Sequence, residues 1–324
     1  QHALEALSRT VAASFLQPGP YTTGRRHEQP PQPLALDFVK RRRVMLRCKT
    51  GRTTMLYSLQ EATYYTSTPM RALARAHAGG PTSVSCCGAN PGMVSWLYKE
   101  ALLRLAADTS VAAAPKTRAD WAQLSMTLGV KGVHVAERDT QVSARAKPPG
   151  VFVNTWSVDG LLSEGYQPAE LGWGTHEKNL PPHGHRFTHG AGYAIWIDRP
   201  GADTRVRSWC PTVGPQFGYV VTHNESLSIP DYYTVWDGDR AIYRPTAHYA
   251  YHPCNDAILS LHEINGSGQL PEKKHILTAD EIISGGDDLG VLLYGHAKGA
   301  MWYGSRLSIA EARALAPYQN ATGM

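Results

Sequence analysis

The sequence has 324 residues, of which 42% are hydrophobic and 18% are charged, as in a soluble globular protein of one large or two smaller domains. It contains no run of about 18 apolar residues, which argues against a membrane-spanning helix. Its start lacks the basic and then apolar pattern of a secretion signal. Five cysteines without C-x-x-C spacing predict reduced thiols, so we expect a cytoplasmic protein.

The net charge of +5 comes from the N-terminal part of the chain. Residues 1–60 hold ten Lys and Arg against three acidic residues, whereas the remainder is slightly acidic. The stretch "VKRRRVMLRCKTGR" at 39–52 offers a cluster of positive charge that nucleic-acid phosphates could meet. A solvated basic face is the commoner use of such a run, so we expect no nucleic-acid partner.

Residues 1–78 form an atypical segment, rich in Pro and polar residues and without a clear period, and we expect it to be partly disordered. Short helices are plausible only at 2–15 and 69–78. The pattern becomes clear at 82–88, which predicts a buried strand. A helix follows, with Asn90 as N-cap and Pro91 at its first position.

The rest of the chain mixes helical and strand periods. The strand-like segment at 231–236 is followed by the turn "DGD" and predicts a hairpin, and "NTWSVDGLLSEG" at 154–165 predicts a turn after a strand. The mixture predicts an α+β fold with a mainly antiparallel sheet and flanking helices. Helices are expected at 118–129, 254–264 and 308–317, and strands at 131–140, 193–198, 204–209, 217–223, 231–236, 289–295 and 300–305.

The segment 154–165 also places Trp156 close to Asp159 and Glu164. One interpretation is a pocket for an organic cation, because an indole face and a carboxylate both attract positive charge. The other is a buried Trp beside solvated acids, which is the usual fate of these residue types.

Acidic and imidazole side chains recur at expected strand ends and turns, where binding sites are commonly built. Each residue alone is best interpreted as a helix cap or a solvated side chain. Together with nearby aromatic residues, the set suits a ligand with several positive charges. The set comprises Glu137, Asp139, Glu164, His223, Asn224, Glu225, Asp256, Asp287 and Asp288, with Trp156, Trp173, Tyr232, Tyr233 and Tyr251.

Other site classes find little support in the sequence. The group His176, His183, His185 and His189 has the density of a zinc site, but it lies in a Pro- and Gly-containing stretch that predicts a mobile polar loop, so we expect no metal. The glycine-rich fingerprints of dinucleotide and phosphate binding are absent.

Several long segments resemble bacterial homospermidine synthase, an enzyme related in fold to saccharopine dehydrogenase. The resemblance covers roughly residues 79–324. It rests on "TSVSCCGANPGMVSW", "GVKGVHVAERDTQ", "NTWSVDGLLSEGYQPAELGWGTHE", "TRVRSWCPTVGPQFGYVVTHNES", "YRPTAHYAYHPCNDAILSLHE" and "LGVLLYGHAKGAMWYGSRLSI".

The resemblance implies an NAD-dependent enzyme of polyamine biosynthesis that joins two putrescine molecules into homospermidine and releases ammonia. In that family NAD is a bound prosthetic group: it accepts a hydride to give an imine, a second putrescine displaces ammonia, and the hydride returns. The organic intermediates are cationic or become so on protonation, so carboxylates and an indole would stabilise them. A general base is also required.

The resemblance also carries roles onto individual residues. Trp156 would make a cation–π contact with the substrate, and Glu164 and His223 would serve as ammonium anchor and base in an order left open. Asp287 would lie beside the reacting carbon. Glu137, Asn90 and Asp256 are expected to bind substrate, and Asn90 and Pro91 to face the cofactor.

The family's glycine-rich nucleotide-binding half is not recognisable in residues 1–78. We therefore expect 79–324 to be the catalytic and dimer-forming domain, with the Rossmann part largely absent. One interpretation is a truncated enzyme that holds NAD poorly; the alternative is a polyamine-binding module without turnover. A homodimer is expected from the family alone.

Overall fold

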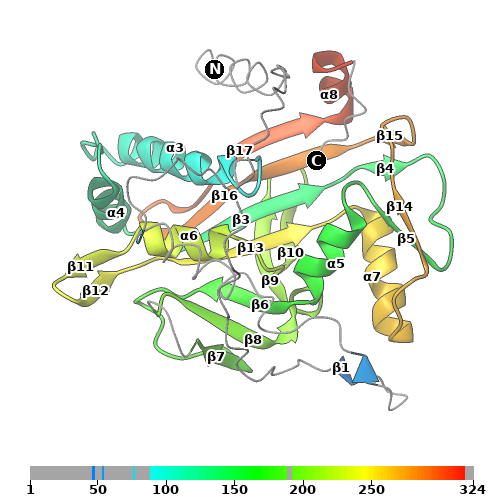
Figure 1. Cartoon of the computed structure of the whole chain (residues 1–324). Coiled ribbons are helices and arrows are strands. Elements are labelled where there is room, and N and C mark those ends of the chain that lie inside the picture. Colours follow the sequence, from blue (N-terminus) through cyan, green and yellow to red (C-terminus); the bar gives the residue numbers. More distant parts are fainter. Residues whose placement is uncertain (1–45, 48–52, 55–75, 77–87, 188–191, 318–324) are drawn as a thin grey trace, which may run out of the picture. The chain divides into compact units, whose positions relative to one another are not determined.

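The computed structural model describes residues 46–47, 53–54, 76, 88–187 and 192–317, which all belong to a compact unit spanning Arg41–Met324 (Figure 1). The helix expected at 2–15, most of the helix at 69–78, the strand at 82–88 up to its last residue, and most of the basic stretch lie outside the described residues. The division between an N-terminal segment and a domain from residue 79 therefore stays a prediction.

The main sheet has nine strands. Seven run in the order β17-β16-β3-β13-β6-β8-β7, β10 pairs with β13, and β9 pairs with β10. Neighbours are antiparallel except β3 and β13, which are parallel. The strands are β3 Gly132–Asp139, β6 Pro168–Gly172, β7 Gly184–Arg186, β8 Ala194–Pro200, β9 Arg205–Cys210, β10 Gly214–Tyr219, β13 Thr246–His252, β16 Gly286–His296 and β17 Gly299–Ser308.

Helices and four small two-stranded sheets complete the described part. The helices are α3 Met93–Asp108, α4 Arg118–Thr127, α5 Val158–Tyr166, α6 Glu225–Tyr232, α7 Asn255–Ser267 and α8 Ile309–Leu315, with a 3-10 turn, η2, at Gly201–Asp203. The small sheets pair β1 Leu46–Arg47 with β2 Thr53–Thr54, β11 Val235–Asp237 with β12 Arg240–Tyr243, β5 Val151–Asn154 with β14 Lys273–Ile276, and β4 Val142–Ser143 with β15 Ile282–Ser284.

The central strands are buried on both faces, and their two faces meet different partners. Along β3, the side chains of Val133, Val135 and Glu137 share one face, and those of His134 and Ala136 share the other. Val133 and Val135 belong to the main hydrophobic core together with residues of α3, α5 and α7. His134 bonds to a serine of β9 and Ala136 packs with Cys210 of the same strand, so the β9–β10 hairpin covers the second face.

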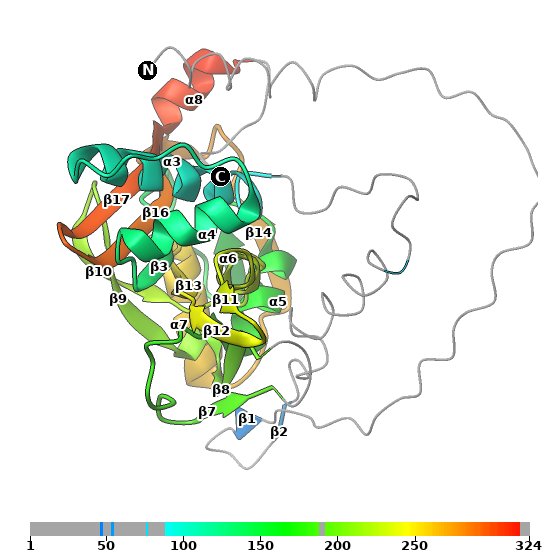
Figure 2. The same cartoon turned by 90° about the vertical axis from the view of Figure 1, so that its left-hand side faces the viewer.

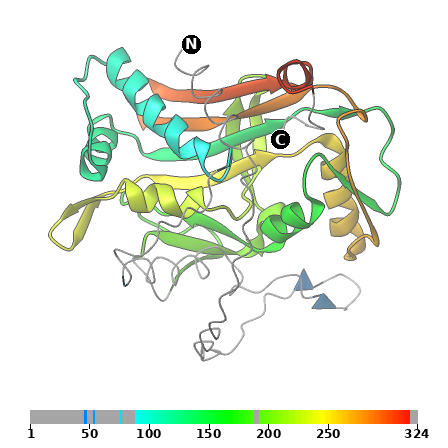
Figure 3. The same ribbon diagram turned by 45° about the horizontal axis from the view of Figure 1, so that its top comes forward.

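The helices of the first face form a layer beside the central strands. α3 packs on β16 and β17, and α6 packs on β13 and β6 (Figure 3). α4 and α6 both contact α3, and the three helices lie together in Figure 2. α3 provides much of the core because Val94, Leu97, Tyr98, Ala101, Leu102 and Leu105 fall on one side of it.

The expected α+β class with a mainly antiparallel sheet is confirmed. The hairpin around the DGD turn forms as β11 and β12. The capping box at the last helix is also present, since the Ser308 hydroxyl accepts from the Glu311 N–H and the Glu311 carboxylate accepts from the Ser308 N–H.

The expected start of the helix after the first strand is wrong by two residues. Gly92, not Asn90, is the N-cap of α3, so Pro91 precedes the helix rather than occupying its first turn. The Asn90 side chain does not cap the helix because its amide donates to Glu137 and Tyr249 instead. A tertiary contact has replaced the local one.

Two further segments differ from expectation. Residues 157–166 form the N-cap and body of helix α5, with the Ser157 hydroxyl accepting from the Gly160 N–H, where a turn was expected. Residues 231–232 end helix α6 rather than beginning a strand. The strand β13 was not expected at all, because both of its faces are buried and neither face carries the exposed polar residues of a half-buried strand.

Candidate active site

Polar side chains gather on the helix-covered face of the main sheet, near the C-terminal ends of the parallel strands β3 and β13. Glu137 of β3 lies opposite Tyr251 of β13, and Asp139 lies opposite Asp287 of β16. Because paired residues point to the same face, the sheet itself places the three carboxylates together.

Glu137 is 1% exposed and is held from outside the sheet by Asn90. The Asn90 amide nitrogen donates to Glu137 Oε2 over 2.5 Å and also to the Tyr249 hydroxyl. The second oxygen, Oε1, is buried without a hydrogen-bond partner. The turn before α3 therefore positions one oxygen of Glu137 and leaves the other available to a ligand.

Asp139 and Asp287 are adjacent and equally enclosed, but their surroundings differ. Asp139 accepts from the Gln141 backbone and side chain over 2.8 and 3.1 Å and from the Thr155 hydroxyl over 2.6 Å. Asp287 Oδ1 is buried without a hydrogen-bond partner. The donors around Asp139 suit an ionised carboxylate, whereas the surroundings of Asp287 suit a protonated one.

Three aromatic rings line the same region. Trp156 lies between β5 and α5, half-buried, and its Nε1 donates to the Tyr251 hydroxyl over 2.8 Å. Tyr251 stacks on Tyr249 with ring centres 5.7 Å apart. Gly160 makes room for the indole, because a Cβ there would come within 2.6 Å of Trp156 Cζ3.

His223 and Glu225 form a buried pair at the start of α6. His223 Nδ1 makes a short hydrogen bond with Glu225 Oε2, and the other Glu225 oxygen accepts from the Gly92 N–H over 2.8 Å. The His223 ring stacks on Tyr249 with centres 4.5 Å apart. Glu164, on α5, is close enough for its charge to act on the imidazole.

Burial and mutual charge shift the acid groups in one direction. Burial raises the pKa of Glu137 well above its usual range, and the charge of Asp139 raises it further. The pKa of Glu164 is also raised, mainly by burial, although His223 opposes the shift. Burial alone would lower the pKa of His223, but the bond and charge of Glu225, with Glu164, raise it overall. The site therefore has excess negative potential that a cation would relieve.

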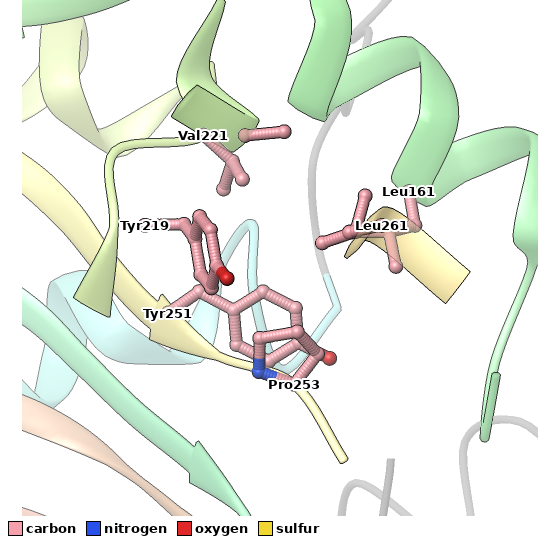
Figure 4. A pocket seen from close by; sticks show the side chains of 7 residues that line it. Leu161, Tyr219, Val221, Tyr251, Pro253 and Leu261 are labelled. Carbon is pink, nitrogen blue, oxygen red and sulfur yellow. The ribbon is translucent and has the colours of Figure 1, made fainter. Parts of the chain in front are cut away.

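A shallow apolar depression adjoins this region at Tyr251 (Figure 4). Leu161 and Leu261 face the rings of Tyr219 and Tyr251 across it. Its lining carries no carboxylate and leaves essentially no space for a water molecule, so it is part of the packed apolar core.

The family model for the saccharopine dehydrogenase C-terminal domain matches residues 88–313, more than two thirds of the chain. The chain belongs to that family. The matched range includes every element that contributes to the site, from the turn at Asn90 to strand β16.

Two relatives with high similarity to this chain are homospermidine synthases. That of Blastochloris viridis is 61% identical over 248 residues, and that of Mesorhizobium japonicum is 59% identical over 251. Each alignment covers 76% of this chain and 52% of the relative. The chain thus spans about half the length of these relatives.

A solved structure shows the same likeness. The homospermidine synthase of Legionella pneumophila, crystallised in complex with NAD, superposes with a TM-score of 0.70 at 51% identity. The match covers 72% of this chain and 51% of that one.

Most residues expected in the site are brought together, namely Asn90, Glu137, Trp156, Glu164, His223 and Asp287. Tyr249 was missed, because its strand was not expected; the alternation in "TAHYAYH" would have placed it beside Tyr251.

Asp256 lies apart from the site, in the first turn of α7, where it is half-buried and the charge of Lys147 acts on it. Its expected role in substrate binding stays a prediction.

Other members of the acid and aromatic set belong elsewhere. Asp288 points to the opposite face, where it accepts from the Thr212 N–H over 2.7 Å. Trp173 is part of a separate apolar cluster, and Tyr233 packs on Tyr98 of α3. Asp159 is exposed and pairs with Lys274, which confirms its interpretation as a solvated acid.

The described residues do not form a phosphate cradle at the start of α3. Asn90 is engaged with Glu137, the Gly92 N–H donates to Glu225, and Pro91 has no N–H and uses its carbonyl to accept from Gly88. These residues do not fit the pyrophosphate of NAD, so the expectation that Asn90 and Pro91 hold the cofactor finds no support in the geometry.

The described residues give no support for a metal site or a membrane-spanning helix. Within the described ranges, no group of three or more His, Cys, Asp or Glu side chains is arranged to hold a metal ion. His185 stacks on Trp196 and His176 pairs with Glu177, while His189 lies outside the described residues. No described helix is both long and apolar enough to cross a membrane.

Proposed function

We propose that this chain carries the amine-binding part of a homospermidine synthase, which joins two putrescine molecules and releases ammonia. The observation that supports it best is the convergence of Trp156, Glu137, Glu164 and Asp287 on one buried, negatively charged region. The similarity of about 60% to homospermidine synthases over three quarters of the chain agrees with this chemistry.

Trp156 is the proposed seat of an ammonium or iminium group. A cation over an indole gains roughly 0.5–2 kcal/mol, with the larger value in desolvated sites. The bond from Nε1 to the Tyr251 hydroxyl fixes the ring and leaves its face for the ligand. The unpartnered oxygen of Glu137 would accept from the same or the second ammonium.

His223 is the proposed proton acceptor, and Glu164 the anchor of the far ammonium. Glu225 bonds to His223 Nδ1 and thereby orients the ring, as a third group commonly orients a catalytic base. This leaves Nε2 to accept the proton of a substrate amine. Because its pKa is raised, the neutral imidazole is a stronger base, but it becomes available only as the pH rises through that pKa.

NAD is the proposed cofactor of the whole protein, supported by the NAD complex of the Legionella relative. Its role there would be to accept and return a hydride. Since the residues at the start of α3 do not fit its phosphates, we assign none of the described residues to it. A homodimer, a cytoplasmic location and the lack of a nucleic-acid partner stay predictions.

The test is incubation of the chain with putrescine and NAD, followed by mass spectrometry for homospermidine. We expect putrescine to bind, and product that His223→Gln abolishes would add that the chain itself completes the reaction. Calorimetry with putrescine alone separates the second candidate, a polyamine-binding module without turnover, which the lack of a phosphate cradle favours. Binding without product would support that module, and absence of binding would contradict both.

A further inference from the structure

Three buried carboxylates lie side by side on two neighbouring strands of the site. Asp139 and Asp287 are directly opposite each other, and Glu137 is two residues from Asp139 on the same face of β3. Their exposed fractions are 1% for Glu137, 1% for Asp139 and 6% for Asp287. Three like charges at this spacing, shielded from water, cannot all be ionised at once in an empty site.

The hydrogen bonds decide which carboxylate keeps its charge. Asp139 receives three, from Gln141 and Thr155, and these stabilise the ionised form. Glu137 receives one, from the neutral amide of Asn90, and Asp287 Oδ1 receives none. The pKa values follow the same order. Burial raises the pKa of Asp139, but the hydrogen bonds of Thr155 and Gln141 oppose the shift, whereas burial and neighbouring charge raise the pKa values of Glu137 and Asp287 well above the usual range.

The charge of Arg138 acts on Asp139, but Arg138 forms no ion pair with any of the three carboxylates. Arg138 and Asp288 alternate to the opposite face of the sheet, where Arg306 pairs with Asp288 over 3.4 Å. Cys210 also lies on that side, and burial raises the pKa of its thiol. Among the ion pairs of the described residues, none involves Glu137, Asp139 or Asp287. The described residues therefore give these three groups no ion-pair partner, and a bound cation would supply one.

We propose that the ligand-free site stores a proton on Glu137 or Asp287, that burial together with the charge of the ionised Asp139 keeps it there, and that a diamine displaces this proton when it binds. The exchange converts a carboxylic acid and an ammonium into an ion pair and releases one proton to solvent. It rests on the proposed function, because the ligand is taken to be a diamine.

His223 is a second possible source of a released proton, because its acidic neighbours raise its pKa and so favour its protonated form. The charges that act on it are those of Glu225 and Glu164. Asp139 is not among them, whereas it acts directly on both Glu137 and Asp287. A change at Asp139 therefore distinguishes the two sources.

The experiment is isothermal titration of the chain with putrescine at pH 7, repeated in buffers with different enthalpies of ionisation. The dependence of the heat on the buffer gives the number of protons released. We expect release on the order of one proton per diamine, because one of its two ammonium groups replaces the single stored proton. Asp139→Asn should bind putrescine but release clearly less, and Asp159→Asn, a surface control, should match the unsubstituted chain.

The outcomes separate this inference from the proposed function. Lack of binding contradicts the proposed function and the inference with it. Binding without proton release, or equal release in Asp139→Asn, overturns the inference alone and, in the second case, points to His223. Infrared difference spectra of the unsubstituted chain give an independent check: addition of putrescine should remove the carbonyl band of a protonated carboxylic acid, and an unchanged band would overturn the inference.

Discussion

The two faces of strand β3 bury titratable groups of opposite kinds. On the helix-covered face lie Glu137 and Asp139, and on the hairpin-covered face lies His134, whose register partner on β13 is His248. Burial raises the pKa of Glu137 and lowers those of both histidines, to about 4 for His248. The same loss of water thus favours protonated acids on one face and neutral imidazoles on the other.

The two faces differ in how their buried titratable groups can avoid an unbalanced charge. The histidines can simply stay neutral: their rings pack with centres 4.3 Å apart, and His134 bonds to the Ser208 hydroxyl over 3.1 Å. The carboxylates instead keep unpartnered oxygens and an excess of like charge. The paired histidines are part of the core, whereas the carboxylate face is arranged to receive a cation.

The largest expected effect concerns the histidine face. A histidine whose folded pKa is lowered costs stability as the pH falls below its unfolded value near 6.5, and the loss is complete below the folded value. At pH 5 the protein should have lost about 2 kcal/mol through His248. Urea unfolding at pH 7.5 and pH 5 should show a smaller loss in His248→Gln. Exposed His262→Gln is the control, and equal losses in all three proteins would refute the assignment.

The next effect concerns the carboxylate face. Glu137→Gln keeps the shape of the side chain but removes its charge, so putrescine should bind roughly 10–100-fold more weakly, the range for losing a charge-assisted hydrogen bond. Calorimetry provides the measurement. Asp288→Asn changes an acid on the opposite face and should leave the affinity within about twofold. A similar loss in both variants would mean that general charge, rather than this face, determines the affinity.

A smaller effect is expected at the indole. Trp156→Ala should weaken putrescine binding by roughly 2–30-fold, corresponding to a cation–π contribution of about 0.5–2 kcal/mol. Trp156→Phe retains an aromatic face and should recover part of the affinity. Unchanged affinity in the alanine variant would show that the indole does not contact the ligand.

The smallest effect is expected at Tyr251. Tyr251→Phe removes only the acceptor that fixes Trp156 Nε1, a hydrogen bond worth about 1 kcal/mol. Putrescine affinity should fall by less than in Trp156→Ala, with little change in thermal unfolding of the fold as a whole. A loss larger than that of Trp156→Ala would place the tyrosine hydroxyl itself on the ligand.

The sequence predicted the fold class and most helices, because these depend on local periodicity and capping. The last helix was correct down to Ser308 and Glu311. The failures occur where tertiary contacts override local preference. Asn90 has the chemistry of a cap but bonds across 47 positions to Glu137. The strand β13 has no exposed polar side to mark it, because both of its faces are covered.

The candidate site was predictable only in part, and for a physical reason. Residue types alone indicated that Trp156, Glu164 and His223 could bind a cation, but their convergence required the resemblance. Nothing local in the sequence relates Asp139 to Asp287, which are neighbours only because β16 returns beside β3. Nor does the residue type reveal that one of these acids is surrounded by donors and the other is not.

The parallel pairing of β3 with β13 also has a kinetic consequence. It pairs Gly132 with Thr246 and Glu137 with Tyr251, so a long loop must close before β3 and β13 can pair with each other. An antiparallel hairpin such as β16 and β17 can form from residues close together in the sequence, whereas β3 and β13 are far apart in the sequence. The floor of the site should therefore assemble late in folding, and a nascent chain would acquire its ligand pocket only after β16 has been synthesised.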